Sequence, residues 1–300
     1  MSLLCIGECM IELGGRDGDT WRMSFAGDTF NAAWAARALT DAPVDYHTAH
    51  GDDPFSDAMR TAMREAGIGE AASPHLPGRR PGLYAITLDG AERSFTYWRS
   101  DAAARHLADD ADALRRSLAD RTIVFLSGIT LAIVRERARL VEALRRARAD
   151  GARIAFDPNH RPALWSAAEA DLAHADLLPI VDYVMTGCDD EAALGRDSDV
   201  ASIMDRYDAR HAAVFVKDGA NGAHVRGADG AIVHVPASPV DAVDTTGAGD
   251  AFDGGALAAL VDGHDPVLAA RQGAAVAAAT VTVHGARASA DTIRQAVHGE

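Results

Sequence analysis

The chain has 300 residues, of which 48% are hydrophobic and 24% are charged, and its formal net charge is −15. A chain of this length and composition can bury a sizeable core, which excludes a disordered or fibrous protein. The excess of acidic residues argues against a nucleic-acid partner, and no apolar run has the character of a membrane span or the pattern of a secretion signal.

The number and spacing of the cysteines indicate the cellular compartment in which the protein is expected. The three cysteines, Cys5, Cys9 and Cys188, form no C-x-x-C pair. An odd number at this spacing fits neither a disulfide framework nor a zinc site. We therefore expect a cytoplasmic protein without a structural metal and without a membrane partner.

The first hundred residues combine buried strands, helices and a hairpin. Strands are expected at Leu3–Ile6, Met10–Leu13, Tyr84–Leu88 and Ser94–Trp98, and helices at Thr29–Leu39 and Pro54–Ala66. The strand at Met10–Leu13 is expected to end in a glycine-rich turn. Asp89-Gly90 lies between two strands of period two, which is a hairpin signal.

After about residue 120, strands alternate with helices. Strands are expected at Thr122–Leu126, Ile154–Phe156, Tyr183–Met185 and Ala213–Lys217, and helices at Ile133–Ala149, Glu169–Leu178, Gly249–Val261 and Pro266–Thr282. A second hairpin is expected through Ala220-Asn221-Gly222. This alternation predicts right-handed βαβ units and an α/β fold with a mostly parallel sheet, from which the first hairpin is an excursion, interpreted as a lid.

Residues 241–252 form the segment with the clearest chemistry. Gly247, Ala248 and Gly249 are small enough for backbone N–H groups to converge at the start of a helix, where the helix dipole favours an anion such as a phosphate. Asp250 would lie beside that anion site. Because a phosphate repels a carboxylate, Asp250 there suggests a base for an attacking hydroxyl group. The alternative is an aspartate that only caps the helix.

Other phosphate and catalytic motifs are absent from the sequence. The only lysine, Lys217, follows Val216, so there is no G-K-[ST] motif, and Phe252 occupies the third glycine position of the dinucleotide fingerprint. There is no H-E-x-x-H motif, and Gly128 is not part of a G-x-S-x-G motif. Hydride transfer and serine hydrolysis both lose support.

Two segments resemble a known family over most of the chain. DTTGAGDAFDGG at 244–255 and AGDTFNAAWAAR at 26–37 are similar to the two signatures of the ribokinase-like (PfkB-type) sugar kinases. Within that family, IGECMIEL at 6–13, YWRSDAAA at 97–104 and FDPNHRPALW at 156–165 resemble 2-keto-3-deoxygluconate kinases. The resemblance implies a single kinase domain over residues 1–300, a three-layer αβα sandwich with a small β lid near 9–25 and 80–100.

The resemblance also implies an activity. It is the transfer of the γ-phosphoryl group of ATP to the terminal C6 hydroxyl of 2-keto-3-deoxygluconate, which gives the 6-phosphate, with Mg²⁺ on the nucleotide. Lid strands in this family often pair between subunits, so a homodimer is implied. The alternatives are a fructose or ribose kinase of the same family and a non-catalytic sugar-acid or nucleotide-binding regulator.

Site residues follow from the same resemblance. Asp250 would be the base, with Gly247, Ala248 and Gly249 offering N–H groups to the phosphoryl group. The sugar would be bound by Gly27, Asp28, Asn31, Tyr84, Tyr97, Arg99 and Arg161. The nucleotide would be bound by Asn159, Lys217, Gly219, Gly222, Gly247 and Gly249. Glu191 would organise the water around magnesium, although Cys188 replaces the asparagine that many family members have near it, and a helix-opening acidic cluster is the alternative.

One of these assignments also has a reason in strand geometry. Tyr97 and Arg99 are two residues apart on a predicted strand, so they point to the same face. A guanidinium matches a carboxylate in two hydrogen bonds, which a sugar acid offers and a neutral sugar does not. The alternatives are a solvated arginine at the sheet edge and, for Arg161, an ion pair with an aspartate.

Overall fold

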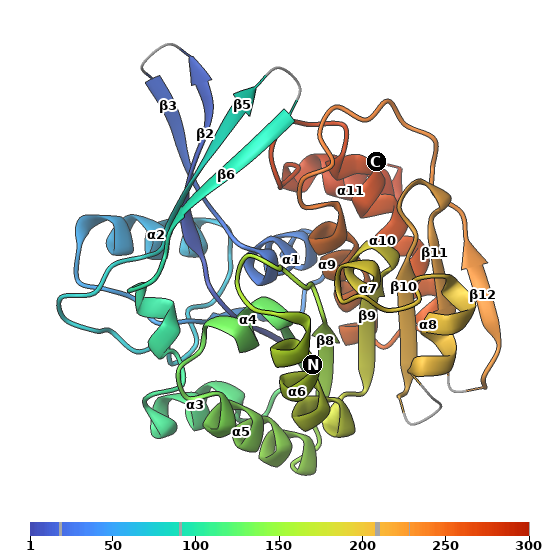
Figure 1. The fold of residues 1–300 in the computed structure, drawn as a ribbon, viewed down its shortest axis with the longest axis horizontal. Helices are drawn as coiled ribbons and strands as arrows, with labels where there is room; N and C mark the ends of the chain where they lie inside the picture. The colour runs from blue at the N-terminus through green and yellow to red at the C-terminus, as the bar shows by residue number, and fades with distance from the viewer. Residues whose placement is uncertain (18–19, 90–91, 208–210, 228, 300) are drawn as a thin grey trace.

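The large sheet forms the centre of the protein. The structure is a computed structural model that describes residues 1–17, 20–89, 92–207, 211–227 and 229–299. The strand order in this sheet is β12-β11-β10-β9-β8-β7-β1-β4 (Figure 1). β11 pairs in antiparallel register with both β10 and β12, and all other neighbouring strands are parallel. Its strands are β1 (Leu3–Ile6), β4 (Val44–His47), β7 (Ile123–Ser127), β8 (Arg153–Asp157), β9 (Tyr183–Gly187), β10 (Ala213–Lys217), β11 (Ala223–Arg226) and β12 (Ile232–Val235).

Helices cover both faces of this sheet, as the alternating pattern predicted. Leu3 and Cys5 of β1 belong to one core cluster, whereas Leu4 and Ile6 belong to the other, because successive side chains of a strand point to opposite faces. The first face is covered by α1 (Asp28–Arg37), α2 (Pro54–Glu65), α9 (Ala248–Val261) and α10 (Pro266–Thr280). The second is covered by α3 (Ala111–Leu118), α4 (Gly128–Ile133), α5 (Arg137–Ala149), α6 (Ala167–Leu177) and α8 (Val200–Arg206).

Short elements complete the described chain. The 3₁₀ turns are η1 (Ala103–His106), η2 (Leu178–Ile180) and η3 (Gly219–Asn221), and the remaining helices are α7 (Cys188–Ala193) and α11 (Ala290–His298). Ile293 of α11 packs against Val276 of α10. No helix in the described ranges combines the length and the apolar character that a bilayer crossing requires. The sheet and its two helix layers match the predicted α/β sandwich with a mostly parallel sheet.

A second, four-stranded sheet stands out from the body of the molecule (Figure 1). Its order is β3-β2-β5-β6, with strands β2 (Met10–Asp17), β3 (Thr20–Ala26), β5 (Leu83–Asp89) and β6 (Glu92–Trp98). β5 and β6 pair in antiparallel register, with Tyr84 opposite Tyr97, so the predicted hairpin strands are present. Gly90 of the predicted turn lies outside the described residues. The small sheet occupies the two segments that were predicted to form the lid.

Two predicted elements were wrong in their extent. β2 does not turn after Leu13 but continues through Gly14 and Gly15, where Gly15 adopts a φ of 57°. The helix expected at Ile133–Ala149 begins only at Arg137, as α5, because the preceding helix α4 ends at Ile133 and Val134 has an extended ψ of 131°. α4 begins directly after β7, where the Ser127 side chain accepts a hydrogen bond from the Thr130 amide.

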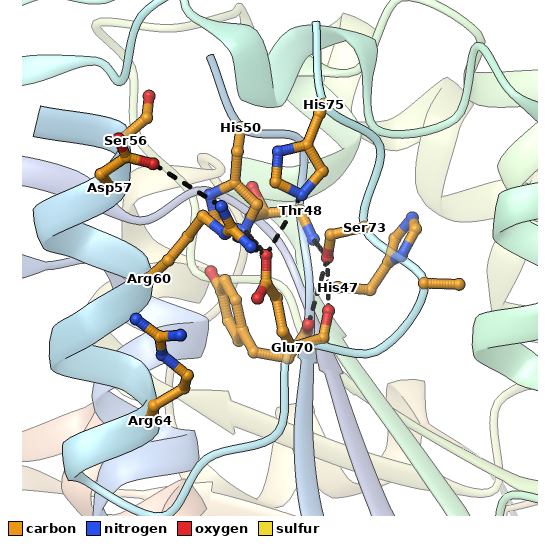
Figure 2. Close-up of polar contacts among 12 residues, drawn as sticks. His47, Thr48, His50, Ser56, Asp57, Arg60, Arg64, Glu70, Ser73 and His75 are labelled. Atoms are coloured by element: carbon orange, nitrogen blue, oxygen red, sulfur yellow. Dashed lines mark hydrogen bonds and ion pairs between the residues drawn. The ribbon is translucent and has the colours of Figure 1, made fainter. Parts of the chain in front are cut away.

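Polar contacts fasten the segment that leads from α2 to the small sheet (Figure 2). The Glu70 carboxylate accepts a hydrogen bond from Arg60 Nε, and its Oε1 lies 3.3 Å from His75 Nε2 and 3.7 Å from His50 Nε2. The backbone of His50 pairs with that of His75 in an isolated bridge. This cluster fastens residues 70–75 to α2 and to the segment that follows β4.

Candidate active site

One large cavity lies at the carboxyl ends of the parallel strands, between the body and the small sheet. Its volume is about 2020 Å³. Open α/β sheets bind their ligands at this edge. Residues lining the cavity include the predicted Gly27, Asp28, Asn31, Tyr84, Tyr97, Arg99, Asn159, Arg161, Lys217, Gly219, Gly222, Gly247, Ala248, Gly249 and Asp250. The structure thus brings together residues that are up to 223 positions apart, from Gly27 to Asp250.

The start of α9 has the backbone geometry that was expected of an anion site. Gly247 is the residue before the first turn and adopts a left-handed φ of 74°, and no side chain caps the helix. A Cβ at Gly247 would lie 2.4 Å from the carbonyl oxygen of Ala286, so only glycine fits. Because the N–H groups of a first helical turn have no partner within the helix, they can bind an anion in the cavity.

Asp250 lies in the first turn of α9 and is not its cap. Asn31 Nδ2 donates a 2.8 Å hydrogen bond to Asp250 Oδ2. Burial raises the pKa of Asp250 to about 6, and the neighbouring Asp28 adds to the increase, whereas Asn31, Arg161 and Lys217 oppose it. A carboxylate with this pKa is ionised at neutral pH and is still basic enough to accept a proton from a hydroxyl group.

The first turn of α1 contributes the polar side chains that lie next to Asp250. Asp28 opens this helix, and its Oδ2 accepts a 2.9 Å hydrogen bond from Asn159 Nδ2. A Cβ at Gly27 would lie only 2.1 Å from the backbone oxygen of Glu8, so the two segments can approach only if residue 27 is glycine. The predicted sugar-binding and nucleotide-binding segments therefore meet through Asp28 and Asn159.

Arg99 is not a solvated edge residue. Its guanidinium forms an ion pair with the buried Glu8, at the junction of β1 and β2, and its Cζ lies 5.8 Å from the centre of the Tyr97 ring. Burial raises the pKa of Glu8, and the charge of Arg99 opposes that rise. The hydroxyl group of Tyr84 donates a hydrogen bond to Glu12. The small sheet thus presents an arginine to the cavity whose charge is already partly balanced.

Arg161 forms the ion pair that was considered as its alternative. Its Nη1 lies 3.2 Å from Asp190 Oδ1. Burial raises the pKa of Asp190 to about 6, with a further contribution from Asp157. Arg161 still lines the cavity, and its charge lowers the pKa of Asp250. The ion pair with Asp190 therefore does not remove Arg161 from the site.

Glu191 does not lie where the magnesium assignment requires it. Its side chain is fully buried and does not line the cavity. Thr186 Oγ1 and Tyr207 Oη donate to one carboxylate oxygen at 2.8 and 2.7 Å, and Arg196 and Arg206 donate to the other at 3.1 and 2.9 Å. These contacts fix α7 to α8 and the end of β9. Asp189 and Asp190, from the same segment, face the cavity instead.

The far end of the cavity is mainly apolar. Gly219 has a φ of 52° and Gly222 a φ of 98°, and both lie in the turn between β10 and β11. A Cβ at Gly222 would lie 2.2 Å from the backbone oxygen of Val235, so packing alone accounts for that glycine. The neighbouring wall is made of small apolar side chains, which are Val240, Ala274, Ala277, Ala278 and Val281.

Sequence reasoning missed several acidic residues of the site. Glu8 and Asp157 follow β1 and end β8, and the rule that ligands bind at the carboxyl ends of strands could have found both. Asp190 stands beside the predicted Glu191. Asp253 lies one helical turn after Asp250, but no sequence pattern indicated that it is buried in contact with Lys217.

Comparisons with known proteins agree with this geometry. Residues 1–293 match the model of the pfkB family carbohydrate kinases. The 2-dehydro-3-deoxygluconokinases of Dickeya dadantii and Escherichia coli K12 are 38% and 36% identical to the chain; the alignments cover 95% and 94% of this chain and 96% and 95% of theirs. The crystal structure of the Thermotoga maritima 2-dehydro-3-deoxygluconokinase superimposes with a TM-score of 0.85 at 21% identity, over 99% of both chains. The chain therefore belongs to the pfkB family of carbohydrate kinases and is a sugar kinase.

Proposed function

We infer that this kinase transfers the γ-phosphoryl group of ATP to the C6 hydroxyl of 2-keto-3-deoxygluconate, also called 2-dehydro-3-deoxygluconate, to give the 6-phosphate. The observation that carries this inference is Asp250, partly buried beside an uncapped helix start in a cavity that also holds Arg99 and Arg161. The likeness to the two 2-dehydro-3-deoxygluconokinases over nearly the whole chain supports the choice of sugar acid.

The proposed chemistry uses few groups of the protein. Asp250 takes the proton of the C6 hydroxyl as its oxygen bonds to the γ-phosphorus, and the bond between that phosphorus and the bridging oxygen breaks to release ADP. The N–H groups at Gly249 and Asp250 face the equatorial oxygens, where negative charge is held in the transition state. Asn31 orients the carboxylate of Asp250 by its hydrogen bond.

The residues present fit ATP and magnesium. The small apolar side chains at the far end of the cavity suit an adenine ring, and the turn at Gly219 leaves open space where a side chain would project. In the described part of the chain, no three His, Cys, Asp or Glu side chains are placed to hold a metal ion by themselves. Magnesium in phosphoryl-transfer sites is held mainly by phosphates and water with one or two carboxylates, and Asp189 and Asp190 would supply these. The bound ion neutralises phosphate charge.

A neutral-sugar kinase is the second candidate. The ion pair with Glu8 favours it, because a guanidinium that is already paired attracts a substrate carboxylate less strongly. A coupled assay for ADP release over a panel of sugars and sugar acids separates the two. We expect the highest kcat/KM with 2-keto-3-deoxygluconate; a higher value with fructose or ribose would contradict the sugar-acid assignment.

We propose that the small sheet acts as the lid and pairs two copies of the chain. Phe95, Tyr97 and Trp98 of β6 are 41%, 45% and 59% exposed, which is unusual for large apolar side chains on one strand. Sedimentation equilibrium should give a dimer, and Trp98→Asp should weaken it. A monomeric wild type would contradict this proposal. A cytoplasmic location stays a prediction from the sequence.

A further inference from the structure

The only lysine of the chain lies between two buried carboxylates next to the anion site. Lys217 Nζ lies 2.9 Å from Asp157 Oδ2, and it lies 3.0 and 3.2 Å from the two carboxylate oxygens of Asp253. The exposed fractions of the three side chains are 13%, 4% and 1%. At least two of the three N–H donors of the ammonium group are thus directed to carboxylates, which differs from the nucleotide contact predicted for Lys217.

These three residues join three elements at the edge of the cavity. Asp157 ends β8, Lys217 ends β10, and Asp253 lies on α9. Asp253 follows Asp250 by three positions, so the two side chains lie on neighbouring parts of one helix face. A Cβ at Gly249 would lie 3.6 Å from Lys217 Nζ. The ammonium group therefore packs directly against the first turn of α9.

Such a cluster is a costly way to stabilise a fold. Burial raises the pKa of Asp253 well above its ordinary value, and the charge of Lys217 opposes this rise. Replacing a buried ion pair by apolar side chains is often neutral or stabilising, so the cluster by itself is weak evidence for a role in stability. Its position, one turn from the proposed base, indicates a role in the site.

We propose that Asp253 is a positioning residue, which together with Asp157 holds Lys217 against the first turn of α9 and thereby fixes Asp250 and the Gly249 N–H group relative to the ends of β8 and β10. This inference rests on the proposed function only in taking Asp250 as the base. Asp253 itself does not line the cavity, so a role through Lys217 is proposed for it and not a contact with the substrate.

Asp253→Asn is the direct test, because asparagine keeps the shape and can still accept a hydrogen bond from Lys217. A small displacement of Asp250 costs turnover, so kcat should fall about 10-fold to 100-fold. The KM values for ATP and for the sugar should change less than about threefold, since no binding group is removed. An increase in the KM values for ATP and for the sugar, with an unchanged kcat, would overturn the proposal.

The pH dependence of kcat gives a readout that a merely structural role would not move. The groups that act on Asp250 are Asp28 and Asn31 of α1, Arg161 after β8, and Lys217 of β10. In Asp253→Asn the charge of Lys217 is less balanced, so the acidic limb of the profile should move to lower pH. Lys217→Met should move it to higher pH. Shifts in the same direction, or none, would contradict the proposal.

Asp182→Asn is the matched control. Asp182 is equally buried and lies 3.0 to 3.2 Å from Arg148 and Arg153, but at the opposite edge of the sheet, before β9. It should lower the melting temperature without changing kcat. If Asp253→Asn does not fold, the double variant Asp253→Asn with Lys217→Met removes a positive and a negative charge together; full turnover in it would overturn the proposal.

Different results would contradict the proposed function and the positioning role of Asp253. A wild type that phosphorylates fructose but not 2-keto-3-deoxygluconate contradicts the proposed substrate, and the variants are then compared with fructose. An Asp250→Asn variant with normal kcat contradicts the assigned base, whatever the result for Asp253. A normal kcat or an unshifted pH profile in Asp253→Asn contradicts the positioning role and leaves the other two assignments in place.

Discussion

Asn31 and Asp250 are 219 positions apart in the chain, yet Asn31 Nδ2 donates a 2.8 Å hydrogen bond to Asp250 Oδ2. The bond joins α1, where the sugar is proposed to bind, to α9, where the phosphoryl group is proposed to bind. An amide N–H group stabilises the ionised form of a carboxylate. With Asp250 as the proposed base, this bond would orient its carboxylate and favour the ionised form that accepts a proton.

Asp250→Asn tests the base directly. Loss of a general base should lower kcat about 10²-fold to 10⁴-fold, while the affinities for ATP and sugar change little because asparagine has nearly the same shape. The measurement is steady-state kinetics with isothermal titration of both substrates. A kcat within tenfold of the wild-type value would show that another group takes the proton.

The pH dependence of turnover follows from the raised pKa of Asp250. Its pKa is about 6 in the folded protein, so the carboxylate is ionised and active above that pH. As the pH falls through 6, protonation removes the base, and kcat/KM, which depends on the pKa values of the free enzyme, should decrease tenfold for each further pH unit. Asn31→Ala removes a hydrogen bond that favours ionisation, so the acidic limb should move to higher pH. A limb that stays in place would show that the hydrogen bond from Asn31 does not lower the pKa of Asp250.

Local patterns in the sequence predicted much of the fold. They did not predict which charged side chains form ion pairs in the site. Leu3–Ile6 is apolar throughout and is buried on both faces, as such a run must be. Gly247 and Asp250 lie in one short segment, so their arrangement followed from helix geometry. The contacts of Arg99 with Glu8 and of Lys217 with Asp253 join distant segments, and charge balance within a cavity depends on which segments meet there. Periodicity carries no information about that.

Gly247 and Gly249 should respond differently to added side chains. Gly247→Ala forces a left-handed conformation that costs alanine about 1 to 2 kcal/mol and brings its Cβ against Ala286, so it should lower the melting temperature. At Gly249 a Cβ would have an ordinary contact distance of 3.6 Å to Lys217 Nζ, so Gly249→Val should fold. Its branched side chain should nevertheless obstruct the N–H groups and lower kcat.

The comparison of the two glycine variants decides what each glycine does. Thermal melts and kcat per folded molecule are measured for both. If Gly249→Val is less stable but has normal kcat, that glycine serves the turn only, and the anion site needs another location.

Arg99 gives the sharpest test of the substrate. Arg99→Ala should raise the KM for 2-keto-3-deoxygluconate about 10-fold to 150-fold, which corresponds to roughly 1.5 to 3 kcal/mol for a hydrogen bond between desolvated charged groups. The KM for ATP should change much less. Arg99→Lys should restore binding only in part, because a single ammonium cannot form the two parallel hydrogen bonds of a guanidinium.

The ion pair with Glu8 requires a control for that test. Arg99→Ala leaves the buried carboxylate of Glu8 without its partner, which destabilises the protein whatever the substrate is. Glu8→Gln combined with Arg99→Ala removes both charges, so it should recover the melting temperature while the KM for the sugar acid stays high. Fructose serves as the neutral substrate, and its KM should hardly change in either variant. If the double variant recovers the KM for the sugar acid, or if the binding of fructose weakens as much, Arg99 does not bind a carboxylate, and the neutral-sugar kinase becomes the better assignment with Asp250 unaffected.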